Sequence, residues 1–194
     1  AGADKTTFNV GKPVADQPGE YNADYSYENS DVVFKNMTVN VGTGDYKGIV
    51  RAKSLYFENC TIVGRGSYWG SGKVVFKNCT FASNDGDYNI WTYSGTEFVF
   101  DSCVFNSDSG KFVNAYKEQR VDTKLDFTNC KFEGSNTGKD AVCLKKYTDL
   151  IWTVNFTNCT APSGKQLWWA ESGLNAASTV TVDGTVVWAN GAQQ

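Results

Sequence analysis

The sequence of 194 residues contains no histidine, and this absence restricts the chemistry open to the protein. Histidine is the commonest general base of enzymes and the commonest nitrogen ligand of zinc. Arginine is scarce, with three residues, and the net charge is −3, so nucleic acid is not an expected partner. No run of about 18 apolar residues occurs, so no segment is expected to insert into a membrane.

Methionine and proline are also rare, with one and three residues, whereas asparagine, threonine, serine, glycine and tyrosine are abundant. This composition is typical of a β protein that is secreted or displayed on a cell surface. Hydrophobic residues make up 41% of the chain and aromatic residues 14%, which excludes a disordered chain. The length is sufficient for one sizeable domain with a core of its own.

An eight-residue motif recurs along the chain at intervals of 19 to 29 residues. Its copies are VVFKNMTV (32–39), LYFENCTI (55–62), VVFKNCTF (74–81), FVFDSCVF (98–105), LDFTNCKF (125–132), VNFTNCTA (154–161) and the weaker VTVDGTVV (180–187). Repeats of this length are typical of solenoids, in which each unit stacks on its neighbours. The variable intervals predict loops of different length around a constant element.

Apolar residues occupy the first and third positions of the motif, which is the alternation of a β-strand with one buried face. The fifth position is almost always asparagine, which tolerates left-handed backbone angles and predicts a corner between two short strands. The sequence therefore predicts an all-β, right-handed parallel β-helix of about seven rungs. A β-propeller is the alternative, although its blades need about 40 to 45 residues. The inward ladder should contain Phe34, Phe57, Phe76, Phe100, Phe127 and Phe156.

We expect one domain overall, with residues 1–31 as an N-terminal cap or first rung and residues 32–194 as the β-helix. The fourth position of the motif supports stacking, because Lys35, Glu58, Lys77 and Asp101 alternate in charge up the expected stack. Neighbouring rungs would then place opposite charges side by side on an outer face.

Five of the six cysteines share one column of the stack, next to the corner, and Cys143 lies outside it. Side chains stacked in parallel are poorly oriented for a disulfide, whose dihedral angle is near 90°. We therefore predict six reduced thiols that fill space in the core. The chain has neither a CxxC pair nor histidine, so no metal and no cofactor are expected.

The repeated F-x-N-C-x-F segments resemble right-handed parallel β-helix repeats of the pectate-lyase-like superfold, as found in bacterial surface proteins. The resemblance covers about residues 32–190 and implies the fold rather than a function. It also implies the alternative of a polysaccharide lyase or hydrolase. The paired aspartates and the G-H-G and R-I-K segments of polygalacturonases are missing here, and no catalytic residue is assigned.

A second strand is expected after each motif, and it carries the candidate site. We align Ile49, Ile90, Val113, Val142 and Leu167 as an inward column, so that their neighbours point outward. The candidate ligand-binding residues on this outer face are Trp91, Tyr93, Asn114, Tyr116, Lys145 and Trp168. Flat aromatic rings beside hydrogen-bonding groups suit a sugar ring or a protein partner. The register of residues 65–73 stays open in this alignment.

These observations favour a non-catalytic, structural or adhesive β-helix module of a secreted or cell-surface protein that binds a glycan or a host protein, and the resemblance implies a bacterial source. The sequence does not identify the ligand, the organism, the oligomeric state or the parent protein.

Overall fold

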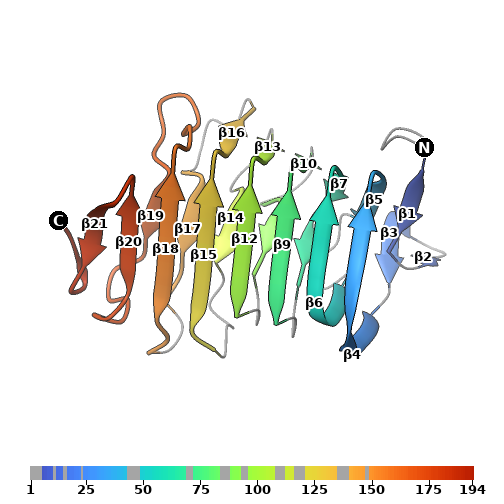
Figure 1. Cartoon of the computed structure of the whole chain (residues 1–194), viewed down its shortest axis with the longest axis horizontal. Helices are drawn as coiled ribbons and strands as arrows, with labels where there is room; N and C mark the ends of the chain where they lie inside the picture. Colours follow the sequence, from blue (N-terminus) through green and yellow to red (C-terminus); the bar gives the residue numbers. More distant parts are fainter. Residues whose placement is uncertain are drawn as a thin grey trace.

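A computed structural model of the chain describes residues 6–10, 12–14, 17–22, 24–42, 49–68, 72–83, 88–92, 96–107, 112–115, 121–134, 140–146 and 149–194. All regular elements of this part of the chain are β-strands. The strands wind into a coil with three sides, and the long strands of one side lie next to each other in Figure 1. None of the described segments is a helix that could cross a membrane.

The first side, which we call the long face, carries the first half of each motif. Its strands are β4 (Asp24–Lys35), β6 (Ile49–Glu58), β9 (Lys73–Lys77), β12 (Glu97–Asp101), β15 (Thr123–Thr128), β18 (Trp152–Thr157) and β20 (Thr179–Val182). Neighbouring strands pair in parallel, with equal motif positions side by side. The stacking of the repeats predicted from the sequence is confirmed.

The second side is a six-stranded sheet that carries the second half of each motif. Its strands are β1 (Thr7–Asn9), β5 (Thr38–Gly42), β7 (Thr61–Gly64), β10 (Thr80–Ser83), β13 (Val104–Ser107) and β16 (Lys131–Glu133). The third side contains β8 (Gly66–Ser67), β11 (Ile90–Trp91), β14 (Val113–Ala115), β17 (Val142–Leu144) and β19 (Trp168–Ala170). The third side joins the long face in one 14-stranded sheet because β6 pairs with both β8 and β9.

The all-β solenoid predicted from the sequence is confirmed, although the number of coils differs slightly from the expected seven. Four coils, which start at β6, β9, β12 and β15, carry a described strand on each of the three sides. The antiparallel strands β20, β21 (Thr185–Ala189) and β22 (Ala192–Gln193) follow the last coil. Near the N-terminus, β2 (Lys12–Val14) and β3 (Gln17–Asn22) form a separate antiparallel pair. The expected division at residues 31 and 32 stays a prediction.

Phenylalanine rings from consecutive rungs stack along the interior, as the motif predicts. The rings of Phe57 and Phe76 have their centroids 4.7 Å apart, and those of Phe100 and Phe127 are 4.6 Å apart. The complete ladder contains Phe34, Phe57, Phe76, Phe100, Phe127 and Phe156. Burial of these rings makes a large hydrophobic contribution to the stability of the coil.

The corner residues of the motif adopt left-handed backbone angles, with φ between 50° and 55°. These residues are Asn36, Asn59, Asn78, Ser102, Asn129 and Asn158. Where asparagines are neighbours, the side chains form a ladder: Asn158 Nδ2 donates to Asn129 Oδ1 at 2.7 Å. The asparagine thus satisfies the backbone geometry and links adjacent rungs.

We expect Asn129→Ala to lower the free energy of unfolding by about 1–2 kcal/mol, because alanine tolerates the left-handed region poorly. Asn129→Gly keeps the backbone angle and loses only the amide ladder, so it should cost less than the alanine variant. Chemical denaturation of both variants measures the difference. Equal losses in the two variants would contradict the assignment of strain to this corner.

Each cysteine next to a corner points into the coil, and its thiol donates to a backbone carbonyl of the preceding rung. The Cys103 Sγ atom lies 3.4 Å from the carbonyl oxygen of Phe76, and Cys130 Sγ lies 3.4 Å from that of Phe100. The neighbouring thiols of Cys130 and Cys79, together with burial, raise the pKa of Cys103 above its ordinary value. All six cysteines are free, as predicted, including Cys143, which lies outside the shared column.

Candidate functional site

The outward column predicted on the third side forms, but its middle members are buried. Trp91 pairs with Asn114, and Asn114 pairs with Cys143, as the alignment required. Their exposed fractions are only 4%, 5% and 3%. The expectation that Trp91 and Asn114 form an exposed surface is therefore wrong. Alternation along a strand shows which side a residue faces, whereas the exposure of that side depends on what packs over it.

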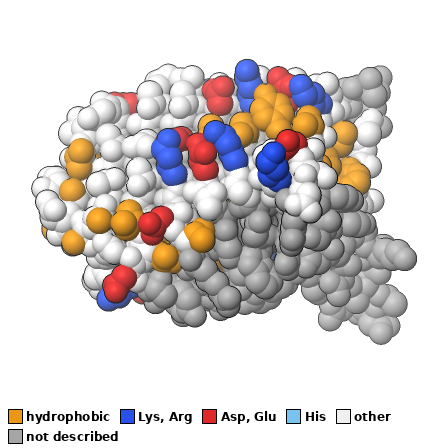
Figure 2. All heavy atoms as spheres, turned by 60° about the horizontal axis from the view of Figure 1, so that its bottom comes forward, with side chains coloured by type: hydrophobic (Ala, Val, Ile, Leu, Met, Phe, Trp, Pro, Cys, Tyr) orange, Lys and Arg blue, Asp and Glu red, His pale blue; other side chains and the backbone are white. Residues whose placement is uncertain are grey.

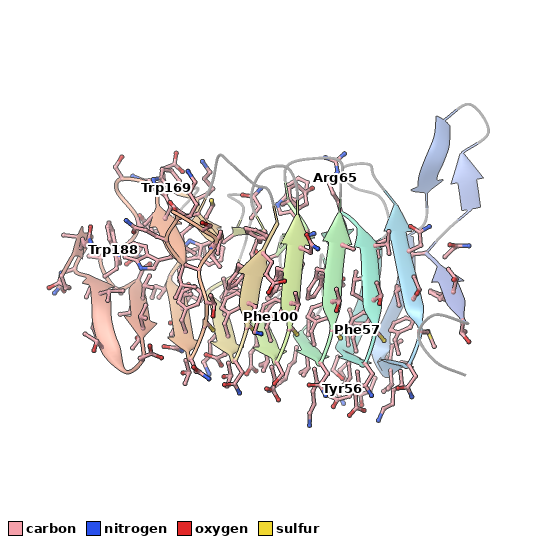
Figure 3. All side chains as sticks on the ribbon, turned by 90° about the horizontal axis from the view of Figure 1, so that it is seen from above. Tyr56, Phe57, Arg65, Phe100, Trp169 and Trp188 are labelled. Atoms are coloured by element: carbon pink, nitrogen blue, oxygen red, sulfur yellow. The ribbon has the colours of Figure 1, made fainter. Side chains whose placement is uncertain are left out.

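Trp91 belongs to a packed cluster on this side of the coil. Its ring contacts that of Tyr88 edge to face, with centroids 5.5 Å apart. The guanidinium of Arg65 lies 5.8 Å from the centroid of the Tyr88 ring. Arg65 is on the outer surface opposite the long face in Figure 3. These contacts favour a structural role for Trp91.

Tyr93 and Tyr116 complete the predicted aromatic cluster and lie outside the described residues. The prediction that they bind a ligand stays a prediction.

The expected register fails at both ends of the third side. At the first end, Ile49 pairs with Ser67, and Ser67 pairs with Trp91, so Ile49 is aligned with Trp91 and not with Ile90. The open register of residues 65–73 is also resolved in part, because Gly66 pairs with Ile90. A single apolar pair such as Ile49 and Val50 does not determine which residue faces inward.

At the other end, Val142 pairs with Trp168 and Cys143 pairs with Trp169, one residue away from the predicted alignment. Trp168 therefore faces the interior, where it packs against the core and contacts the Trp188 ring edge to face at 5.9 Å. Assigning Trp168 to the outer surface was wrong. Two adjacent tryptophans satisfy either register equally well, and only the pairing of β19 with β17 distinguishes them.

Trp169 is the outward aromatic residue, and its exposed fraction is 41%. Of the predicted site residues, Lys145 is beside it: its Nζ atom lies 4.7 Å from the centroid of the Trp169 ring. A cation at this distance over an indole face is attracted by the electrons of the ring. In Figure 3, Trp169 lies on the side opposite Tyr56 and the long face.

The backbone beside Trp169 is held by a carboxylate. Glu171 Oε2 accepts a hydrogen bond of 2.8 Å from the backbone N–H of Lys146. The side chain of Lys146 extends over Gly173, since a Cβ atom there would lie 3.0 Å from Lys146 Nζ. We call Lys145, Lys146, Trp169 and Glu171 the Trp169 patch. It combines an exposed aromatic ring with two ammonium groups, which can donate hydrogen bonds to hydroxyl or carboxylate oxygens.

On the long face, three carboxylates form ion pairs with lysines. Glu58 Oε2 lies 2.7 Å from Lys35 Nζ, and the hydrogen bond and charge of Lys35 lower the pKa of Glu58. Glu97 lies 3.1 Å from Lys73, and Asp126 lies 2.6 Å from Lys124. Among the described residues, no group of three or more acidic or cysteine side chains could hold a metal ion.

Comparison with known proteins identifies the family. A family model described as a right-handed β-helix region matches residues 20–161, which is most of the chain. The chain belongs to the right-handed β-helix family. The resemblance predicted from the motifs is confirmed for the fold. Neither a curated protein nor a solved structure matches the chain significantly.

Proposed function

We propose that this right-handed β-helix is a non-catalytic module of a secreted or cell-surface protein that binds carbohydrate at the Trp169 patch. The observation that carries the proposal is the exposed indole of Trp169 with the Lys145 ammonium against its ring. The C–H face of a sugar packs well on an indole, while neighbouring donors select its hydroxyl or carboxylate groups. The patch contains two lysines and one glutamate, and this net positive charge favours an acidic sugar.

The electrostatics of the long face support a non-catalytic role. A glycosidase needs one carboxyl group that stays protonated near neutral pH and a second carboxylate across a cleft. Lys35 instead holds Glu58 in its ionised form by lowering its pKa. The side chains of Glu97 and Asp126 are likewise paired with lysines. These ion pairs form a surface of alternating charge along the long face.

The test is binding of the chain to immobilised polysaccharides, with acidic and neutral examples side by side. We expect binding to acidic polysaccharides, and Trp169→Ala should weaken it by more than about 1 kcal/mol, the usual threshold for a binding anchor. Lys145→Met should weaken binding of acidic more than of neutral sugars. The melting temperature of both variants should stay close to that of the unchanged chain.

A matched control is Tyr56→Ala, because Lys35 Nζ lies 5.5 Å from the Tyr56 ring on the long face. This variant removes an equivalent aromatic–lysine pair far from the patch, so it should bind as the unchanged chain does. Absence of binding to the whole panel would reject the proposal. Release of new reducing ends or unsaturated uronates would instead favour the lyase or hydrolase alternative.

A further inference from the structure

The outer surface of the long face consists of three columns of side chains that run along the coil. The central column is mostly apolar at its N-terminal end and contains Val33, Tyr56, Val75, Val99 and Asp126. Val33 is 54% exposed, which is unusual for valine in a sheet. Figure 2 shows hydrophobic side chains with lysines and acidic residues on both sides of them.

The two outer columns are charged, and the sign alternates from rung to rung. The first contains Asp31, Ser54, Lys73, Glu97 and Lys124. The other contains Lys35, Glu58, Lys77, Asp101 and Thr128. The rungs of β9 and β12 are therefore opposite in charge in both columns: β9 carries two lysines, and β12 carries a glutamate and an aspartate.

We propose that this face binds a second copy of the chain, face to face, around a two-fold axis that runs along the strands between β9 and β12. This axis places β9 of one copy over β12 of the other. Lys73 then faces Glu97 of the second copy, and Lys77 faces its Asp101. Each pair occurs twice by symmetry, and Val75 packs on Val99 of the second copy at the centre.

The next rungs fit the same axis. β6 lies over β15, so Tyr56 faces Asp126 of the second copy and its hydroxyl can donate to that carboxylate. Ser54 faces Lys124, and Glu58 faces Thr128. In the rungs from β6 to β15, this arrangement places no two like charges opposite each other.

Four other placements of the axis bring like charges together. An axis through β9 would place Lys73 on Lys73 of the second copy, and an axis through β12 would place Glu97 on Glu97. An axis between β6 and β9 would place Asp31 against Glu97 of the second copy. A two-fold axis along the coil would place Lys73 against Lys77 and Glu97 against Asp101. Since like charges in contact oppose association, the alternation of charge disfavours these four placements.

The interface would be small. Six strands spaced about 4.8 Å apart and five residues long cover roughly 25 Å by 17 Å. The area of this rectangle is below the standard interface area of about 800 Å² per partner, so the dimer is expected to be weak. Because exposed ion pairs contribute, its dissociation constant should rise with salt concentration.

The experiment is sedimentation of two charge variants, alone and mixed. Lys73→Glu/Lys77→Glu makes both rungs negative, and Glu97→Lys/Asp101→Lys makes both rungs positive. Each variant alone should sediment as a monomer, with the dissociation constant raised at least about tenfold. Mixed in equal amounts, they should form a 1:1 dimer, because every facing pair is then opposite in charge.

The matched control is Lys131→Glu/Lys165→Glu, which changes the net charge as much but lies off the long face. It should dimerise as the unchanged chain does. An uncharged variant, Val75→Gln/Val99→Gln, tests the same contact without altering the charge ladders and should also weaken the dimer. An unchanged chain that stays monomeric at millimolar concentration in low salt overturns the proposal. So does a mixture of the charge variants that fails to associate.

Discussion

Replacing Phe100 with alanine is expected to lower the free energy of unfolding by about 3–5 kcal/mol. Phe100 is fully buried and stacks between Phe76 and Phe127, with ring centroids 5.3 Å and 4.6 Å away. The ring also contacts Phe105 edge to face at 5.4 Å. Alanine would leave a cavity in the middle of the ladder, and the rungs above and below are fixed by strand pairing and can close it only in part.

Chemical denaturation followed by far-ultraviolet circular dichroism measures this loss. The control is Val99→Ala, because Val99 is the neighbouring residue on β12 and points to the opposite side of the sheet. We expect the control to cost less than about 1 kcal/mol, as for surface substitutions in general. Similar losses for both variants would show that the ladder is not the main source of stability at this rung.

Gly66→Ala should also destabilise the coil, by roughly 1–3 kcal/mol, because it overpacks the interior. A Cβ atom at Gly66 would lie 2.8 Å from the hydroxyl oxygen of Tyr68 and 3.0 Å from a carbon of its ring. The Tyr68 ring is fully buried and makes edge contacts with Phe57 at 6.1 Å and Phe76 at 5.4 Å. These rings leave Tyr68 little room to move away from the new methyl group.

Tyr68→Phe distinguishes this contact from a general intolerance of change. The Tyr68 hydroxyl is buried without a hydrogen-bond partner, and burial raises its pKa above the ordinary value. Removal of the hydroxyl should therefore be neutral or slightly stabilising. Gly66→Ala should then cost less in the Tyr68→Phe background than in the unchanged chain. Additive effects of the two substitutions would contradict the proposed contact.

The motif side of the molecule could be predicted because each of its features is local and is repeated in every rung. Alternating apolar residues require one buried strand face, and asparagine accepts the corner angle that other residues resist. The equal register of Phe57, Phe76 and Phe100 then follows from stacking identical units. A glycine such as Gly66 carries no apolar signal, so its alignment with Ile90 emerged only from strand pairing.

The candidate site was less predictable because its strands are short and the segments before them vary in length. β11 contains two residues and β19 three, too few for alternation to define a register. For this reason Trp168 was assigned to the outer surface in place of Trp169, and the contact of Lys145 with Trp169 was missed.

The amino-acid sequence alone determined the all-β class, the stacking of the rungs, the inward phenylalanine ladder and the shared column of five cysteines. These follow from periodicity and from backbone preferences of single residues, which act over a few positions of the chain. Tertiary structure decided which outward residues remain in contact with solvent. Trp91 and Asn114 are buried whereas Trp169 is exposed, because burial of an outward side chain depends on contacts between segments far apart in sequence.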